Sequence, residues 1–184
     1  NRLAGSPGNR AMAKMFKSRM KSFGYSVREE GFRAPIFTDD GASIFVDGEE
    51  IEAKPYMYTC NTPEEGITAE MIFIDNFSEL VTKDCREKIV VYRLHGAEIK
   101  DNFGDEELLL SQKGAKALIM VNSGEPIFVG STEAGYFDPE KRFLIQPNDP
   151  RKVPIVAISH SDGITLFRHK DKPVSIVSRT GNET

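Results

Sequence analysis

Three short apolar runs, rich in β-branched residues, constrain the fold of this chain more than any other feature. They are KIVVYRL (88–94), AKALIMVNS (115–123) and VPIVAIS (153–159). The charged stretch GDEELLLSQK joins the first run to the second and has the composition of a helix. Gly114 follows it directly, and a residue without a Cβ ends a helix at little cost. Two buried strands joined through a helix predict a parallel βαβ crossover.

The N-terminal segment predicts an amphipathic helix. Ser6 precedes Pro7 as a capping residue precedes the first helical position, and Gly24 stops the helix. An apolar stripe recurs at helical spacing between them and comprises Met12, Phe16, Met20 and Phe23. This stripe needs a partner surface. Packing against a protein core is favoured over lying on a membrane, which basic amphipathic helices also do.

The remaining segments predict a β-rich chain. Strand character marks three further runs, YSVREEGF, SIFVDGEEIEA and ITAEMIFID, and Asp47-Gly48 within the second favours a hairpin turn. SDGITLFRH predicts a short helix, and residues 122–153 are expected to form a long loop. We therefore expect an α/β (α+β mixed) fold. It has a β-rich core with a βαβ crossover and flanking short helices, plus the N-terminal amphipathic helix.

Charge and composition exclude several classes of protein. The 184 residues suffice for one medium domain, and 28 acidic against 24 basic residues give a net charge of −4 with both signs well mixed. No basic stripe exists for a nucleic acid backbone to follow, so no nucleic acid partner is expected. No apolar run approaches the roughly 20 residues that span a bilayer. The chain has no starting Met and is expected to be a fragment of a longer protein.

The three histidines do not assemble a catalytic site in the sequence. His169 and Asp171 have the His-x-Asp spacing of a metal ligand pair, but their hydrophilic surroundings predict a solvated loop. His95 follows a strand, and it either faces a pocket at the strand's carboxyl end or lies in a surface loop. His160 lies between two serines that predict a helix cap. No catalytic, metal-binding or cofactor-binding residue is therefore assigned.

The cysteines and the acidic pairs leave alternatives open. Cys60 and Cys85 form either a disulfide, which needs an oxidising compartment, or two buried thiols. Adjacent carboxylates on a strand point to opposite faces, so most acidic pairs are expected to be solvated. These pairs are Glu29-Glu30, Asp39-Asp40, Glu49-Glu50, Glu64-Glu65 and Glu106-Glu107.

Two parts of the chain resemble known families. KIVVYRLHG, a helix ending in QKGAKALIMVN, and VPIVAISHSDGITLF together resemble the protease-associated (PA) domain. The opening, RLAGSPGNRAMAKMFKSRMKSFGYSV, resembles the start of the two-zinc aminopeptidases, the family that includes aminopeptidase Y and bacterial leucyl aminopeptidases. The two matches cover roughly residues 2–28 and 65–168. Their combination is more specific than either half.

The resemblance implies an accessory region without zinc ligands of its own. In that family the PA domain is inserted ahead of the zinc ligands, so zinc is expected in the parent catalytic domain and no cofactor in this chain. Residues 1–60 are then a helix and strand or hairpin segment resembling the start of the peptidase domain, 61–168 the PA domain, and 169–184 a linker returning toward the catalytic domain. A secreted or cell-envelope location follows from the resemblance alone.

The resemblance also indicates a contact surface. Arg93 and Gly96 match the family pattern after the first strand, whereas Ala97 stands where the family often has a cysteine. Arg93, His95 and Gly96 are expected to contact a partner or substrate. The loop 93–102 and the excursion 122–151 are the candidate surfaces, because both leave the carboxyl ends of strands.

These observations lead to one main expectation and one alternative. We expect a non-catalytic PA region of a zinc aminopeptidase that shapes substrate access or binds peptide or protein partners, the partner being a peptide substrate or its own peptidase domain. The alternative is a free-standing protein- or peptide-binding module with no peptidase attached. A complete enzyme within 184 residues is not expected, because no nucleophile–base pair or convergent ligand set is present.

Overall fold

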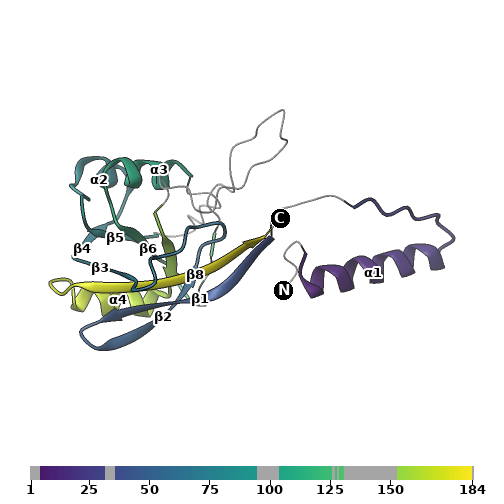
Figure 1. The fold of residues 1–184 in the computed structure, drawn as a ribbon, viewed down its shortest axis with the longest axis horizontal. Coiled ribbons are helices and arrows are strands. Elements are labelled where there is room, and N and C mark those ends of the chain that lie inside the picture. Colours follow the sequence, from purple (N-terminus) through teal and green to yellow (C-terminus); the bar gives the residue numbers. More distant parts are fainter. Residues whose placement is uncertain are drawn as a thin grey trace. The chain divides into compact units, whose positions relative to one another are not determined.

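The computed structural model describes residues 5–31, 36–94, 104–125, 127, 129–130 and 153–183. Figure 1 shows the course of the chain. The described elements are, in chain order, α1 (Pro7–Ser22), β1 (Ile36–Val46), β2 (Glu49–Pro55), β3 (Ile67–Ala69), β4 (Met71–Ile74), α2 (Phe77–Thr82), β5 (Ile89–Arg93), α3 (Gly104–Gln112), β6 (Ala117–Val121), β7 (Ile155–Ile158), α4 (His160–Arg168) and β8 (Val174–Glu183).

The strands form one mixed sheet in the order β3-β8-β1-β2-β7-β6-β5-β4. β4, β5, β6 and β7 run parallel to one another, whereas β1 with β2, β2 with β7 and β3 with β8 pair antiparallel. The parallel pairing of β5 with β6 across α3 confirms the predicted crossover. The mixed sheet with its helices confirms the expected α/β (α+β mixed) fold.

The hairpin between β1 and β2 forms where the sequence predicts it. Asp47 and Gly48 both have positive φ angles, 49° and 87°, and Val46 pairs with Glu49 across the turn. Positive φ at both central residues is the property of the two-residue turns that match the twist of antiparallel strands. The turn therefore fixes the register that sends Ile44 and Ile51 to the same buried face.

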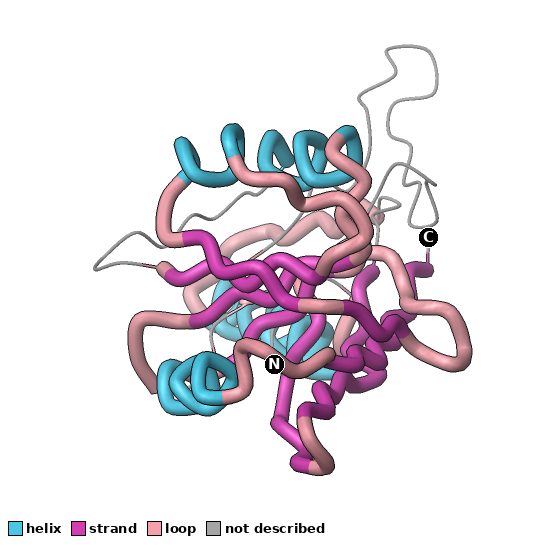
Figure 2. The backbone as a smooth tube through the Cα atoms, turned by 90° about the vertical axis from the view of Figure 1, so that its left-hand side faces the viewer, coloured by secondary structure: helices cyan, strands magenta, loops and turns pink. Residues whose placement is uncertain are grey.

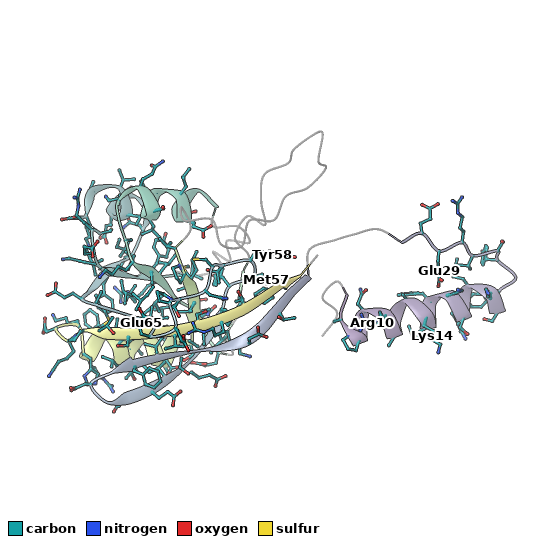
Figure 3. The ribbon with its side chains drawn as sticks, viewed as in Figure 1. Arg10, Lys14, Glu29, Met57, Tyr58 and Glu65 are labelled. Carbon is teal, nitrogen blue, oxygen red and sulfur yellow. The ribbon has the colours of Figure 1, made fainter. Side chains whose placement is uncertain are left out.

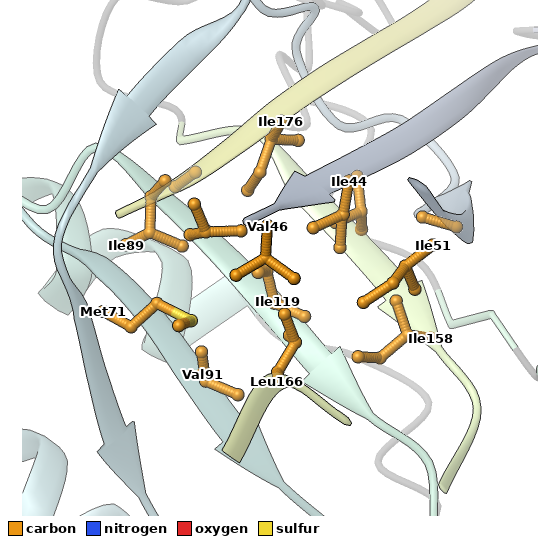
Figure 4. Close-up of a cluster of buried hydrophobic side chains, with 14 of the residues drawn as sticks. Ile44, Val46, Ile51, Met71, Ile89, Val91, Ile119, Ile158, Leu166 and Ile176 are labelled. Atoms are coloured by element: carbon orange, nitrogen blue, oxygen red, sulfur yellow. The ribbon is translucent and has the colours of Figure 1, made fainter. Parts of the chain in front are cut away.

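One face of the parallel strands packs against β1, β2, β8 and α4. This core cluster, shown in Figure 4, gathers alternate residues of the strands because successive side chains point to opposite faces. Leu166 contributes from α4. The labelled members in the figure are Ile44, Val46, Ile51, Met71, Ile89, Val91, Ile119, Ile158, Leu166 and Ile176. The sheet thus folds over so that its antiparallel part covers its parallel part.

The opposite face of the parallel strands packs against α2 and α3, which Figure 2 shows together above the strands. Leu80 of α2 and Leu110 of α3 are buried with Val90, Leu118 and other residues of the second cluster. Strands covered on both faces are continuous apolar runs. The core of the fold is therefore the part that the three apolar runs predict.

α3 ends as predicted at Gly114. This glycine has φ +73°, and the N–H of Ala115 donates to the carbonyl of Leu110 at 3.0 Å. Such a left-handed residue after the last helical turn satisfies carbonyls that the helix leaves without partners. Ala115 and Ala117 are both buried, so the chain passes directly from the helix end into the core strand β6.

The chain folds into two compact units: unit 1 comprises residues 1–38 with 181–184, and unit 2 comprises residues 39–180. Within unit 1, Ser6 caps the start of α1, and its side chain accepts a hydrogen bond from the N–H of Asn9 at 3.1 Å. Figure 3 shows Arg10 and Lys14 projecting from the helix. None of the α1 residues is buried. The predicted helix is confirmed; Phe16, Met20 and Phe23 of its apolar stripe are exposed, and Met12 is half-buried.

Two segments differ from the predictions. Residues 25–31 contain no regular secondary structure, so the strand expected for YSVREEGF is wrong there. Most of these residues are exposed, and Glu29 forms an ion pair with Lys17 of α1 at 2.8 Å. Residues 174–183 form β8, which lies between β3 and β1 in the sheet, although the sequence indicated a linker over 169–184. Among the described residues, no helix is long and apolar enough to cross a membrane.

Candidate binding site at the carboxyl edge of the parallel strands

β5 and β6 end side by side. Arg93, the last residue of β5, lies opposite Val121, the last residue of β6, and the N–H of Leu94 donates to the Val121 carbonyl at 3.0 Å. Because neighbouring parallel strands point the same way, their carboxyl ends share one edge of the sheet. Open α/β sheets bind ligands at this edge.

Helix α4 begins at the same edge, directly after β7. Its N-cap Ser159 accepts a hydrogen bond from the N–H of Asp162 at 3.1 Å, which confirms the helix cap predicted around His160. One turn into the helix, a Cβ built on Gly163 would be 2.2 Å from Cγ1 of Val121. The missing side chain therefore allows α4 to lie directly against the end of β6.

Arg93 forms a two-pronged ion pair with Asp75, the first residue after β4. Its Nε donates to Oδ1 at 2.6 Å and its Nη2 to Oδ2 at 2.7 Å. This geometry is the one in which a guanidinium and a carboxylate match best. The hydrogen bonds to Asp75 raise the pKa of Arg93 above its ordinary value. Arg93 is thus a fixed, charge-paired group at the edge of the sheet.

Phe167 of α4 faces the same ion pair. Its ring contacts the ring of Phe73 edge to face, with centroids 5.4 Å apart at 84°. The guanidinium carbon of Arg93 lies 5.8 Å from the Phe167 centroid, and Nζ of Lys170 lies 5.6 Å from it. Cations at such distances are attracted to the face of an aromatic ring. Nevertheless 47% of Phe167 remains exposed to solvent.

These groups surround a hollow of about 140 Å³, named here the edge hollow. It is lined by the ends of β5 and β6 and by one flank of α4. The described lining residues are Arg93, Leu94, Val121, Asn122, His160, Gly163, Ile164 and Phe167. Most of these side chains are apolar, and the polar ones lie at the strand ends and the helix start.

A second hollow, of about 290 Å³, lies between β2 and the start of α4 and carries three carboxylates. Two of them are occupied within the chain: Glu125 accepts hydrogen bonds from Ser161 Oγ at 2.8 Å and Ser161 N at 3.2 Å, and Asp162 accepts one from Ser159 at 2.6 Å. The hydrogen bond from the Ser161 hydroxyl lowers the pKa of Glu125. The hydrogen bonds of these two carboxylates therefore stabilise the start of α4.

The structure describes one of the three predicted contact residues. Arg93 lies at the carboxyl edge as expected. His95 and Gly96 lie outside the described residues, and so does most of the excursion 122–151. Sequence reasoning missed Asp75 and Phe167, which complete the site. One sequence signal could have located Asp75. Asn76 is followed by Glu79 three residues later, a spacing typical of a capped helix start, and Asn76 does cap α2. This pattern indicates that β4 ends and the chain turns at Asp75.

The acidic and histidine residues considered as candidates lie in different environments. His169 caps the end of α4, and its Nδ1 lies 3.6 Å from Oδ2 of Asp47. No three His, Cys, Asp or Glu side chains gather into a possible metal site among the described residues. Four of the five acidic pairs are exposed as expected, but Glu106 and Glu107 are buried because they lie on α3, whose inner side packs on the sheet.

Neither cysteine forms a disulfide in the structure. Cys85 is fully buried in the second core cluster, whereas Cys60 is half-buried. Burial raises the pKa of the Cys85 thiol. The structure therefore contains two thiols rather than a disulfide, but of the two buried thiols that the sequence left open only Cys85 is buried.

Sequence comparison finds peptidases. The chain is 23% identical over 181 residues to the "Probable lipoprotein aminopeptidase LpqL" of Mycobacterium tuberculosis, covering 95% of the chain and 33% of that protein. It is 30% identical over 118 residues to "Carboxypeptidase Q" of Xenopus laevis, covering 63% of the chain and 24% of that protein. No protein-family model matches the chain. The chain thus spans a third or less of the length of these relatives.

Structure comparison finds the same fold in solved peptidase structures. The aminopeptidase of Aneurinibacillus sp. strain AM-1 has a TM-score of 0.68 at 22% identity, over 98% of this chain and 41% of that chain. A peptidase M28 precursor from Shewanella amazonensis has 0.73 at 15%, over 98% and 44%. BSAP, a zinc aminopeptidase from Bacillus subtilis, has 0.65 at 17%, over 99% and 40%. The fold of this chain matches about two-fifths of the length of each of these proteins.

Proposed function

We propose that the chain is the non-catalytic part of a zinc aminopeptidase and that unit 2 is its protease-associated domain, which guides peptides or binds a protein partner. The observation that carries this proposal is the near-complete match of the chain to one portion of several aminopeptidases. The sequence relatives, both bearing peptidase names, support the same class. The proposed domain is larger than residues 61–168, because β1, β2 and β8 belong to the same sheet.

The zinc is proposed to be held by residues of the parent protein outside this chain. Zinc sites use three or four His, Cys, Asp or Glu ligands, and the described residues present no such group. Arg93 and the loop that follows β5 would instead contact the peptide or the peptidase domain. A secreted or cell-envelope location is part of the proposal, and the lipoprotein name of one relative supports it.

Unit 1 fits the same proposal. α1 exposes a cluster of large apolar side chains, and apolar side chains of this size are rarely left in water together. They are Met15, Phe16, Met20 and Phe23. We propose that the peptidase part of the parent protein covers them.

The test uses the full-length protein loaded with zinc. Replacing residues 95–102 with a Gly-Ser linker of equal length is expected to change KM for long peptides and to leave the hydrolysis of single-residue anilides unchanged. The matched control is Asp47→Asn in the hairpin turn, which keeps a turn residue and is expected to change neither. Unchanged kinetics at every peptide length, for this loop and for 131–151, would contradict the guiding role.

A free-standing peptide-binding module is the second candidate, and the edge hollow favours it because residues of unit 2 alone line it. The coding sequence beyond Thr184 separates the two. An apolar strand ending in His-x-Asp, followed by a Glu-Glu pair, supports the aminopeptidase. Zinc-dependent hydrolysis by the 184-residue chain alone would contradict both.

A further inference from the structure

We propose that the edge hollow binds one apolar side chain of a peptide. This inference rests on the proposed function for the ligand being a peptide, and it adds which part of the peptide is recognised and where. The hollow lies beside the end of β5, the strand from which the loop with the expected contact residues departs. Its lining, size and pre-set walls each point to this ligand.

The size of the edge hollow selects a single side chain. Sites for drug-sized molecules and cofactors enclose about 300–1,000 Å³. The edge hollow has about 140 Å³. It is therefore too small for a whole metabolite, whereas one leucine or phenylalanine side chain has about the right volume to fill it. A peptide inserting one residue leaves its backbone outside, at the rim.

The walls of the hollow are apolar and exposed. Ile164 and Phe167 are 45% and 47% exposed, and they are neighbours on α4 because residues three apart lie on one helix face. Val121 is buried at the bottom, where it packs so closely against Gly163 that a Cβ on this residue would be 2.2 Å from Cγ1 of Val121. Two half-exposed large side chains around one depression give an apolar ligand group a surface against which it can be buried.

The charges at the hollow are already paired, so the hollow selects against a charged ligand group. Arg93 gives two of its donors to Asp75, at 2.6 and 2.7 Å. Phe167 is held by the ring of Phe73. Both walls are thus fixed before a ligand arrives, which lowers the cost of binding. His160 also lines the hollow and offers a polar side chain beside these apolar walls.

The experiment titrates the 184-residue chain with blocked tripeptides, Ac-Gly-X-Gly-NH₂, and follows backbone amide signals by NMR. Leu and Phe at X are expected to bind with a Kd of about 10 mM, as the burial of one side chain allows. They should shift the amides of Leu94, Val121 and Ile164. Gly and Asp at X are expected to bind at least about tenfold more weakly, because they bury no apolar side chain.

The variant Ile164→Asp places a charge in the wall and is expected to weaken binding of the Leu peptide by about tenfold or more. Its matched control is Leu108→Asp on α3, because Leu108 is also 45% exposed. This control should leave binding unchanged. Circular dichroism of both variants checks that each remains folded, and the specificity series on the unmodified chain does not depend on either variant.

The proposal is overturned if the Leu and Gly peptides bind alike, if the shifted amides lie elsewhere, or if Ile164→Asp binds as the unmodified chain does. None of these outcomes affects the proposed function, which is decided by zinc-dependent kinetics of the full-length protein. Conversely, specific binding of the Leu peptide at the edge hollow would stand even if the parent protein had no peptidase activity.

Discussion

The guanidinium of Arg179 on β8 donates to both oxygens of Thr62, to the hydroxyl at 2.7 Å and to the carbonyl at 3.0 Å. It also donates to the carbonyls of Pro63 and Glu64, at 3.1 and 3.0 Å. One side chain therefore satisfies three consecutive backbone carbonyls of a segment that has no regular structure. It ties the connection between β2 and β3 to β8, the strand that lies between β3 and β1 in the sheet.

We expect Arg179→Met to lower the free energy of unfolding by about 1–2 kcal/mol, because the carbonyl and hydroxyl of the buried Thr62 lose their charged donor. Arg179→Lys is expected to recover only part of this loss, since an ammonium group cannot reproduce the fork of donors. Urea unfolding followed by circular dichroism measures both values.

The control for this prediction is Arg86→Met. Arg86 is an exposed arginine of the same unit, so its replacement is expected to change the free energy of unfolding by less than about 0.5 kcal/mol. Equal losses for the two Met variants would show that the network around Thr62 contributes nothing specific.

The sequence predicted the parallel core because its strands are buried on both faces. Such strands are continuous apolar runs, and β5, β6 and β7 stand out for that reason. β8 escaped notice because it is covered on one side only: Val174, Ile176 and Ser178 are buried while the residues between them are less so. Thr180 is buried as well, and a strand in which two of the four buried positions are Ser and Thr resembles a polar linker in sequence.

The candidate site could be predicted only in part, because its residues come from separate elements. Arg93 followed from the end of an apolar run. Its partner Asp75 is adjacent only because β4 pairs parallel with β5 in the register that sets Ile74 opposite Tyr92. Phe167 joins them through the docking of α4. Register and helix docking are tertiary properties, and no local pattern in the sequence encodes them.

Gly163→Ala is expected to destabilise the chain although alanine favours helices. The gain in helix propensity is about 1 kcal/mol, but the new Cβ would be 2.2 Å from Cγ1 of Val121, and overpacking of this kind costs about 1–3 kcal/mol. The shift in urea midpoint measures the balance. In the double variant with Val121→Ala, part of the clash is removed, so the two losses are expected to be less than additive.

Gly124→Ala is the matched control for this change, because no atom lies within 4 Å of a Cβ built on Gly124. It is expected to alter the midpoint very little. A stabilising effect of Gly163→Ala would mean that α4 can move away from β6 at no cost, and it would remove the steric basis of the edge hollow.

Burial makes Tyr56 a source of pH dependence in the alkaline range. Desolvation raises the pKa of Tyr56 from 10.0 to about 12, and a hydrogen bond with the backbone of Gly130 opposes the shift. Below pH 10 the phenol is protonated in both states. Between pH 10 and 12 only the unfolded chain releases the proton, so the stability contributed by Tyr56 is lost as the pH rises through this range.

Urea unfolding of the unmodified chain and of Tyr56→Phe between pH 7 and 11 measures this effect. The free energies of the two proteins are expected to differ by a constant amount up to about pH 9. Above pH 10 the unmodified chain should lose stability relative to the variant, because phenylalanine has no proton to release. Parallel curves over the whole range would contradict the burial of an un-ionised phenol at this position.

The thiols are expected to differ sharply in reactivity. Only a thiolate that reagent can reach reacts, and Cys85 is fully buried with a pKa raised by burial, whereas Cys60 is half-buried. An aromatic disulfide reagent at pH 8 should therefore modify one thiol per folded chain quickly and the second only as fast as the chain unfolds. In concentrated guanidinium chloride both should react at once. Cys85→Ser should keep the fast phase and Cys60→Ser should lose it; a folded chain with no reactive thiol until a reductant is added would instead reveal a disulfide and contradict the two free thiols.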